Sequence, residues 1–474
     1  MKKKLFLVGT GCGAGTLTRE AEAAINGAEV VIGAERVLRE LFLANAPKPS
    51  PRLISAKPSE IPGILGSLSE ERSVAVVFSG ASGFYSGAKS VLLAVEAFAD
   101  AAAFEVRVLP GISSLQMLAA RLGVPWQDWK LVSAHGRKAN AVREVMDGRG
   151  TFFLTGGANS PAAICGELAE AGLGELLAAV GENLGASCRP FCGTAEAREE
   201  KDATFGGTLE ATMRPSSGTA EAREEKDTGF FENFRAGERI VRGTAVELSK
   251  MDFQDPAVLW VAPLANANRR FFGGIPDTEF VRGKVPMTKA EVRSVILSKL
   301  APAREDVVWD VGAGTGSVSV ELGLFAGRVF AFERKAEALE LIEENRRKLG
   351  AWNVVPVAGE APGVFYGCRA CEGEKRQLSY PAPDKVFVGG SGGHLPEIVK
   401  TVREANPKAT ICVSAICLET LEVARKVLAG DGFSIEVVQI SILRTENVAG
   451  LSMLKAQNPV FLVTAGPEEY MGGK

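Results

Sequence analysis

The sequence predicts an α/β protein in which strands alternate with helices around parallel sheets. Two stretches carry this prediction, because in each a short apolar run ends in glycines and continues into a helical pattern: residues 4–26 and residues 306–322. A third observation is that strand and helix patterns keep alternating after both starts. Strands joined through helices lie parallel, so we expect sheets wrapped by helices.

The composition indicates a multidomain globular protein. The 474 residues suffice for two or more domains, and a hydrophobic content of 46% with a net charge of -3 gives no bias toward nucleic acid or an anionic membrane. No apolar run is long enough to span a bilayer, and the basic start at residues 1–4 is not followed by a cleavage site. We therefore expect a cytoplasmic protein that binds neither nucleic acid nor membrane.

The eight cysteines show no disulfide framework, as expected in a reducing compartment. Cys188 with Cys192 and Cys368 with Cys371 could together supply four thiolates to zinc. These pairs lie far apart in the sequence, so loop cysteines are the simpler interpretation and no metal site is predicted.

The first half predicts a strand at residues 4–8, followed by a helix at 19–26 for which Thr18 is a good N-cap. Further strands are expected at residues 29–33, 74–80 and 104–109, with helices near 89–98 and at 115–122, the latter capped by serines. Residues 239–244 and 257–261 give later strands, 257–261 being the last. Ligands of such sheets gather where the strands end.

In the second half, strands are expected at residues 306–311, 328–333, 353–359, 384–388, 411–415, 433–443 and 459–465, with a helix at 335–349. These would form a sheet of about seven strands. The stretch 367–380 is expected to be a surface loop.

A glycine turn, residues 309–316 (WDVGAGTG), follows the first of these strands, and Glu333 ends the next one, 17 residues after Gly316. A carboxylate at that position can accept hydrogen bonds from ribose hydroxyls. A dinucleotide fingerprint would need glycine where the chain has Ser317, and Asp310 would repel a pyrophosphate but suit the cationic end of S-adenosylmethionine. We therefore predict S-adenosylmethionine; a glycine turn without a ligand is the simpler alternative.

Four motifs of the first half, residues 8–13 (VGTGCG), 79–87 (SGASGFYSG), 109–114 (LPGISS) and 132–137 (VSAHGR), resemble the tetrapyrrole methylase family, in its precorrin C5-methyltransferase branch; residues 180–184 (VGENL) fit the same branch. The resemblance implies cofactor contacts at Gly80, Ala81, Ser113, Ser114 and Leu154, and substrate contacts at Gly9, Gly11, Gly13 and His135. The family has proline where this chain has Cys12, a mild change in a loop. It has aspartate where this chain has Ala81, so a carboxylate is missing from a loop that the family places against S-adenosylmethionine, and this bears on C5 methylation.

From residue 274 onward the chain resembles the precorrin-6B C15-methyltransferases (decarboxylating), through residues 274–277 (GIPD), 287–293 (MTKAEVR), the glycine turn, 389–393 (GGSGG), 418–421 (LETL) and 458–461 (NPVF). The resemblance implies cofactor contacts at Thr288, Gly312, Ala313, Gly314, Thr315, Gly316, Glu333 and Ala361, and substrate contacts at Gly392 and Gly393. His394 is the first candidate for proton transfer and Glu419 a weaker one; helix capping, solvation or a purely structural role are the alternatives.

The order of the two parts is that of the fused C5,15-methyltransferases of cobalamin biosynthesis. This implies a tetrapyrrole methylase of two α/β subdomains at residues 1–265, a linker at 266–274 and a Rossmann-like class I methyltransferase at 275–474. An insert at about 186–233 carries the same ten residues twice, at 193–202 and 218–227, and is expected to be solvated, with a docking surface as the alternative.

The implied activity is S-adenosylmethionine-dependent methylation of precorrin-6B, or its cobalt form, at C5 and C15, with decarboxylation of the C12 acetate, by a homo-oligomer of the EC 2.1.1 class. Two alternatives remain. In one, only the C15 site works and the first half is a docking or tetrapyrrole-carrier domain. In the other, the whole chain is a tetrapyrrole carrier with vestigial sites. A nicotinamide oxidoreductase ranks last because of Ser317.

Overall fold

A computed structural model describes residues 2–42, 51–68, 72–97, 104–137, 139–185, 237–264, 273–366, 377–430 and 433–467. The predicted insert, most of the predicted linker and Cys188, Cys192, Cys368 and Cys371 lie outside these residues. The chain divides into two compact units, unit 1 (Met1–Gln127, Ala179–Val241 and Gln254–Val258) and unit 2 (Asp128–Ala178, Arg242–Phe253 and Leu259–Lys474). The domain limits expected from the sequence stay a prediction.

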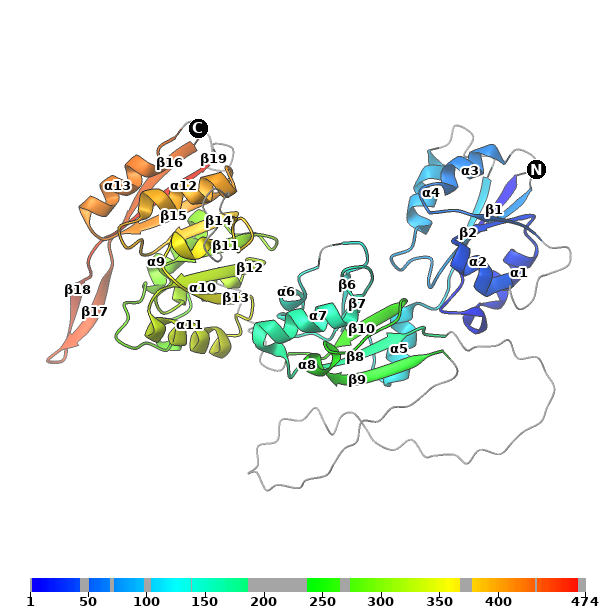
Figure 1. Cartoon of the computed structure of the whole chain (residues 1–474), viewed down its shortest axis with the longest axis horizontal. Coiled ribbons are helices and arrows are strands. Elements are labelled where there is room, and N and C mark those ends of the chain that lie inside the picture. Colours follow the sequence, from blue (N-terminus) through cyan, green and yellow to red (C-terminus); the bar gives the residue numbers. More distant parts are fainter. Residues whose placement is uncertain are drawn as a thin grey trace, which may run out of the picture. The chain divides into compact units, whose positions relative to one another are not determined.

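The first sheet, in unit 1, has the strand order β3-β2-β4-β1-β5, and all its neighbouring strands are parallel. Alternate residues of β1 face opposite cores: Leu5 and Leu7 pack with α3 and α4, and Val8 packs with α1 and α2. The elements are β1 (Lys3–Gly9), β2 (Val30–Gly33), β3 (Arg52–Ser55), β4 (Ser73–Phe78), β5 (Phe104–Leu109), α1 (Arg19–Asn26), α2 (Glu35–Phe42), α3 (Ile61–Ser67), α4 (Ala88–Glu96) and α5 (Ser114–Leu122) (Figure 1).

The second sheet has the order β6-β7-β10-β8-β9, and its strands are assigned to both units. β10, the last strand predicted for the first half, occupies the middle of this sheet. The elements are β6 (Lys130–Ser133), β7 (Thr151–Leu154), β8 (Leu177–Glu182), β9 (Arg239–Thr244), β10 (Ala257–Val261), α6 (Ala141–Val145), α7 (Pro161–Leu168) and α8 (Ala245–Leu248).

The third sheet, in unit 2, has seven strands in the order β13-β12-β11-β14-β15-β19-β16. Strands β11 to β15 are parallel, whereas β19 runs antiparallel to both of its neighbours. The strands are β11 (Val307–Val311), β12 (Arg328–Glu333), β13 (Val354–Ala358), β14 (Lys385–Val388), β15 (Thr410–Ala415), β16 (Phe433–Ile440) and β19 (Val460–Pro467).

Helices cover both faces of this sheet (Figure 1). Adjacent residues of β11 belong to different cores, Val308 to one and Trp309 to the other, and both are fully buried. This explains why the strands read as continuous apolar runs. The helices are α9 (Ala290–Leu300), α10 (Ser317–Gly323), α11 (Ala336–Lys348), α12 (Leu395–Ala405) and α13 (Leu418–Leu428), and short helical turns occur at Ala14–Thr16, Ala169–Leu173, Asp277–Glu279 and Gly363–Phe365.

The predicted α/β class, the alternation of elements and the seven-stranded sheet are confirmed. Thr18 caps α1 by accepting a hydrogen bond from the Ala21 amide, as predicted, and Ser113 forms a capping box with Gln116 at α5. Among the described residues no helix is both long and apolar enough to cross a bilayer.

The strand predicted at residues 433–443 is wrong at its end. β16 stops at Ile440, and the chain leaves the sheet as a separate hairpin, β17 (Leu443–Val448) and β18 (Leu451–Ala456). The turn between them has positive φ at Ala449 and Gly450, and Asn447 closes it by accepting a hydrogen bond from the Gly450 amide. The hairpin extends away from the seven-stranded sheet (Figure 1).

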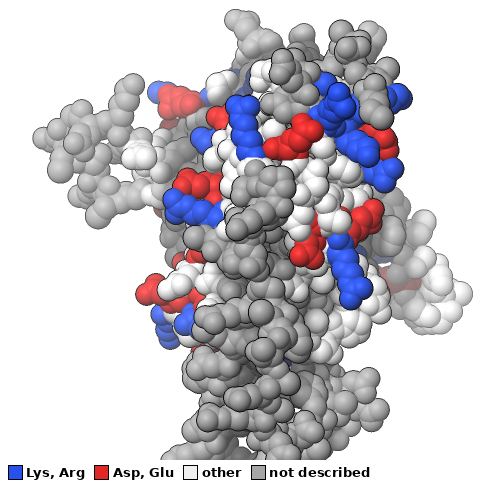
Figure 2. Space-filling model, turned by 90° about the vertical axis from the view of Figure 1, so that its right-hand side faces the viewer, with Lys and Arg blue, Asp and Glu red and all other residues white. Residues whose placement is uncertain are grey.

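On the described part of the face in Figure 2, basic and acidic side chains are interspersed. Along α2, Arg36 pairs with Glu40 and Arg39 pairs with Glu35. Mixed signs of this kind agree with the small net charge of the chain.

Candidate cofactor sites

A cavity of about 480 Å³ opens at the carboxyl ends of β11, β12 and β14 in unit 2. Its size is that of a small-molecule site, and its place is where ligands of open parallel sheets bind. The lining comes from the glycine turn after β11, the end of β12, the glycine segment after β14 and the segment before α9.

The glycine turn brings two backbones together. The Gly312 amide donates to the Phe332 carbonyl over 2.9 Å, and the Gly389 amide donates to the Val311 carbonyl over 2.9 Å. Gly312 has φ of 73°, and a Cβ placed there would lie 2.5 Å from the Gly390 carbonyl oxygen. Only glycine fits this position, so the turn after β11 and the segment after β14 form one close-packed floor.

Asp310 lies at the end of β11 on the wall of the cavity and is fully buried. The Ser319 hydroxyl donates to its Oδ2, while its Oδ1 has no hydrogen-bond partner. Burial, with a smaller contribution from the charge of Glu333, raises the pKa of Asp310 from its ordinary value of 3.8 to about 7. Asp310 Oδ1 can therefore pair with a cationic or hydrogen-bond-donating group of a ligand.

Glu333 ends β12, as predicted, and its carboxylate is held by backbone donors. Oε2 accepts from the Gly314 amide over 2.9 Å, and Oε1 accepts from the amides of Arg334 and Lys335 over 2.9 and 3.0 Å. A carboxylate oxygen can accept more than one hydrogen bond, so this arrangement fixes the acceptor without exhausting it.

Of the site residues predicted in the second half, most line the cavity: Thr288, Gly312, Ala313, Gly314, Thr315, Glu333, Ala361 and Gly392. Gly316 instead packs against α11, where a Cβ would lie 3.0 Å from Ile342. Gly393, His394 and Glu419 are not part of the lining that the described residues form. His394 is exposed and is the N-cap residue of α12, but its side chain forms no capping hydrogen bond; Glu419 is exposed in the first turn of α13. Their chemical roles stay predictions.

Several lining residues were not predicted from the sequence. Lys289, Arg334 and Lys335 add positive charge, and Ile416, which is 63% exposed, adds an apolar edge. Gln457 and Asn458 contribute from the segment before β19. Lys289 could have been found from its place beside Thr288, whereas nothing local marks Ile416 as a neighbour of the glycine turn.

In unit 1, the loops after β1, β4 and β5 meet. The amides of Gly11 and Gly80 each donate to the other residue's carbonyl, over 3.0 and 2.8 Å. A Cβ on Gly111 would lie 2.3 Å from the Gly80 carbonyl oxygen and 2.6 Å from that of Gly9. Three loops that are distant in sequence thus form one glycine cluster at the carboxyl ends of β1, β4 and β5.

The other residues predicted in unit 1 lie around this cluster. Gly13 and Ala81 belong to the first two loops, and Ser114 is the first residue of α5. The Ser113 hydroxyl donates to Gln116 Oε1 and accepts from the Gln116 amide, and its contact with a cofactor stays a prediction.

His135 and Leu154 belong to unit 2. His135 Nδ1 lies 3.2 Å from the Thr155 carbonyl oxygen, directly after Leu154. A backbone-bonded loop histidine was the alternative left open for this residue, and its role in substrate binding stays a prediction. Among the described residues, no group of three or more His, Cys, Asp or Glu side chains could hold a metal ion.

Comparison with known proteins separates the chain into two matched regions. Residues 4–189 match the model of the tetrapyrrole (corrin/porphyrin) methylases, and residues 279–465 match that of the precorrin methyltransferase domain.

Three relatives illustrate the similarity. A probable cobalt-precorrin-6B C(15)-methyltransferase (decarboxylating) of Pyrobaculum calidifontis is 43% identical over 197 residues, which are 40% of this chain and 95% of that protein. The cobalt-precorrin-6B C(15)-methyltransferase (decarboxylating) of Salmonella typhimurium is 36% identical over 41% of this chain and 96% of that protein. A solved structure of a precorrin-6Y C5,15-methyltransferase from Geobacter metallireducens is 37% identical, covers 41% of this chain and 97% of that chain, and has a TM-score of 0.36. The chain therefore belongs to the family of the cobalt-precorrin-6B C(15)-methyltransferases and is a methyltransferase.

Proposed function

We propose that the chain is a bifunctional S-adenosylmethionine-dependent enzyme of cobalamin biosynthesis that methylates precorrin-6B, or its cobalt form, at C5 and C15 and decarboxylates the C12 acetate. The observation that carries the proposal is the cavity of unit 2, in which a glycine floor, the unpartnered oxygen of Asp310 and the fixed carboxylate of Glu333 lie together.

The residues of this cavity fit the cofactor. Glycine at position 312 lets the turn after β11 pack directly against the Gly390 backbone, which a Cβ would contact at 2.5 Å, and both glycines line the cavity. Asp310 would face the cationic amino acid end, because a buried carboxylate with a free oxygen gains most from a positive partner. Glu333 would accept hydrogen bonds from the ribose hydroxyls, as acidic residues at the end of a second parallel strand do.

When bound, S-adenosylmethionine supplies an electrophilic methyl group on a positively charged sulfur. The task of the chain is then to orient a nucleophilic carbon of the substrate in line with that methyl group and to keep water away. The walls near Val311, Val318 and Phe332 are apolar and line the cavity, so they suit exclusion of water.

The outer part of the cavity suits a flat macrocycle that carries carboxylates. Lys289, Arg334 and Lys335 provide cations, and Ile416 and Ile442 provide apolar surface. Arg334 is paired with Glu360 over 2.8 Å, so its guanidinium is already oriented and can pair with a substrate carboxylate through its remaining donors. The names of the relatives at 43% and 36% identity support C15 and decarboxylation as the reaction of this site.

The C5 reaction is proposed for the first half of the chain, from the match of residues 4–189 to the tetrapyrrole methylases and from the glycine cluster of unit 1. The position of Ala81, where the family has aspartate, leaves the alternative of a docking or carrier domain.

The test uses the full chain and one variant for each site. Gly312→Val should force the turn after β11 away from the segment after β14, and Gly111→Val should force apart the loops of unit 1. Each protein is incubated with S-adenosylmethionine and precorrin-6B, and the products are analysed by mass spectrometry and NMR.

We expect the wild type to add two methyl groups and release carbon dioxide, Gly312→Val to methylate only C5, and Gly111→Val to methylate only C15 with decarboxylation. A wild type that methylates only C15 would refute the C5 activity and leave the docking or carrier alternative for the first half. A wild type that transfers no methyl group to either the cobalt-free or the cobalt-bound substrate would refute the proposed function.

A further inference from the structure

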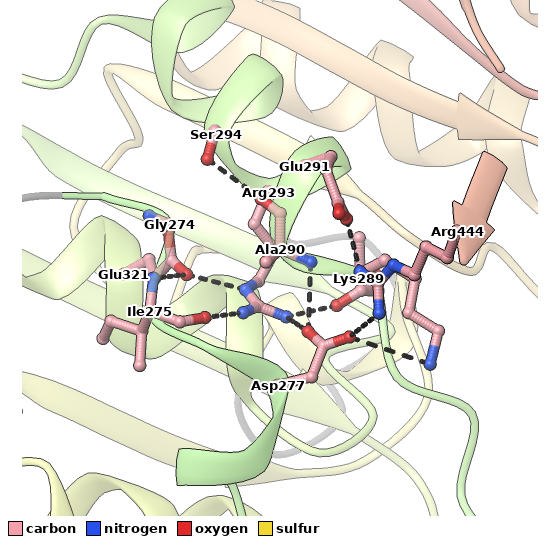
Figure 3. A network of polar contacts seen from close by, with 11 residues as sticks. Gly274, Ile275, Asp277, Lys289, Ala290, Glu291, Arg293, Ser294, Glu321 and Arg444 are labelled. Carbon is pink, nitrogen blue, oxygen red and sulfur yellow. Dashed lines mark hydrogen bonds and ion pairs between the residues drawn. The ribbon is translucent and has the colours of Figure 1, made fainter. Parts of the chain in front are cut away.

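An ion network centred on the buried Arg293 includes Lys289, which lines the cavity of unit 2 (Figure 3). Arg293 of α9 is fully buried, and its guanidinium donates to Glu321 Oε1 over 2.7 Å and to Asp277 Oδ1 over 2.9 Å. It also donates to the carbonyl oxygens of Thr288 and Ile275. A buried arginine is tolerated only when its donors are paired, and here two carboxylates and two carbonyls pair them.

The network connects residues 274–277 to α10, the helix that follows the glycine turn. Glu321 lies on α10, which begins directly after Gly316. Its two oxygens accept from the amides of Gly274 and Ile275 over 2.8 and 3.0 Å. A displacement of Arg293 would therefore also displace Glu321 and α10, the helix that follows the glycine turn.

Asp277 provides the cap that α9 lacks. Lys289 is the N-cap residue of α9 but forms no side-chain cap, and the Ala290 amide instead donates to Asp277 Oδ1 over 3.0 Å. The first amides of a helix need acceptors from outside it. Because Thr288 and Lys289 line the cavity, the residue that caps α9 also fixes one wall of the cofactor site.

The hairpin reaches this cap through Arg444, the second residue of β17. Arg444 donates to Glu291 Oε2 over 2.6 Å, and its other terminal nitrogen lies 3.5 Å from Asp277 Oδ2. Lys289 Nζ lies 3.9 Å from the same Asp277 oxygen, so the two cations share one carboxylate. The hydrogen bond to Arg444 holds the pKa of Glu291 below its ordinary value, as a formed ion pair does.

We propose that Arg444 is a positioning residue for the cofactor cavity, which it orders by holding Asp277 and Glu291 so that Asp277 caps α9 and Lys289 stays at the cavity wall. The expected effect on cofactor binding rests on the proposed function. The ordering of the start of α9 by Arg444 does not. Arg444 would thus act on the cofactor site from outside, because it does not belong to the cavity lining formed by the described residues.

The test is hydrogen–deuterium exchange on the full chain, followed by mass spectrometry of peptides. Arg444→Lys, Arg444→Gln and Arg444→Glu form a graded series. Lys426→Gln and Lys426→Glu are matched controls, because Lys426 is an exposed cation of α13 that pairs with Glu422 over 2.5 Å and is not part of the cavity lining.

Without cofactor, we expect faster exchange in the peptide that contains Ala290 for Arg444→Gln, more so for Arg444→Glu, and partial recovery for Arg444→Lys. Cofactor affinity is then measured by titration with S-adenosylmethionine, with the protection of residues 312–316 from exchange as the readout. For Arg444→Gln this affinity should be about 2- to 5-fold weaker, which corresponds to the free energy of a partly exposed ion pair. The Lys426 controls should match the wild type in both measurements.

Unchanged exchange around Ala290 in both Arg444→Gln and Arg444→Glu would overturn the proposal, and so would faster exchange with unchanged cofactor affinity. If the Arg444 variants exchange faster but S-adenosylmethionine protects no peptide of the wild type, the ordering role stands and the proposed function fails. Equal effects of the Arg444 and Lys426 variants would reveal general destabilisation and would also overturn the proposal.

Discussion

Replacing Asp310 by asparagine should remove a fall in the stability of unit 2 between about pH 4 and pH 7. Asp310 is fully buried at the end of β11, and burial raises its pKa from the ordinary value of 3.8 to about 7. Between these two values the folded state holds a proton that the unfolded state has lost. Stability is therefore greatest below the lower value and declines until the pH passes the upper one.

The size of the effect follows from the difference between the two pKa values. At about 1.4 kcal/mol for each pH unit, the buried charge costs about 4 kcal/mol once both states are ionised. About 1 kcal/mol of this cost is already present at pH 4.5, so the wild type should lose about 3 kcal/mol between pH 4.5 and 7.5 through this residue. In a unit of this size, that corresponds to about 6 to 12 °C in melting temperature.

The assay compares wild type and Asp310→Asn by urea unfolding and calorimetry at several pH values. An asparagine next to Ser319 has its own cost, but that cost does not depend on pH and cancels in the comparison of slopes. Parallel curves for the two proteins across this range would refute the assignment of a raised pKa to Asp310. Because a cationic ligand group favours the ionised carboxylate, cofactor affinity in the wild type should also rise as the pH increases through 7.

Three further predictions concern the same site. Gly312→Ala should abolish cofactor binding in unit 2, because its Cβ would lie 2.5 Å from the Gly390 carbonyl oxygen; calorimetric binding at wild-type strength would contradict this. Glu333→Gln keeps one acceptor for Gly314 but loses the charge, and should weaken cofactor affinity by about 10-fold. A change below 2-fold in the titration followed by hydrogen–deuterium exchange would show that Glu333 does not bind the ribose. His394→Ala should leave cofactor affinity unchanged and slow tetrapyrrole methylation by at least about 10-fold; an unchanged rate would show that this exposed imidazole takes no part in the reaction.

The parts of the site that could be predicted are those in which a local pattern fixes the geometry. The glycine turn needs backbone conformations that glycine adopts, and Glu333 follows it at the distance of one helix and one strand, so both could be located from spacing. Ile416 and Asn458 could not, because they meet the turn only through the order of strands in the sheet. The shared carboxylate of Asp277 was missed for the same reason, since its partners lie on α9 and β17.

The strand order also explains why the hairpin starts at the cavity. β16 and the parallel strands run in the same direction, whereas β19 between them runs in the opposite one. The end of β16 and the beginning of β19 therefore lie at the same sheet edge as the carboxyl ends of β11 and β14, and Ile442 and Val460 accordingly line the cavity. Any segment that connects β16 to β19 must leave and return at this edge. A two-stranded hairpin meets that condition. Arg444, near the start of its first strand, can therefore reach Glu291 in the first turn of α9 and Asp277, which caps this helix.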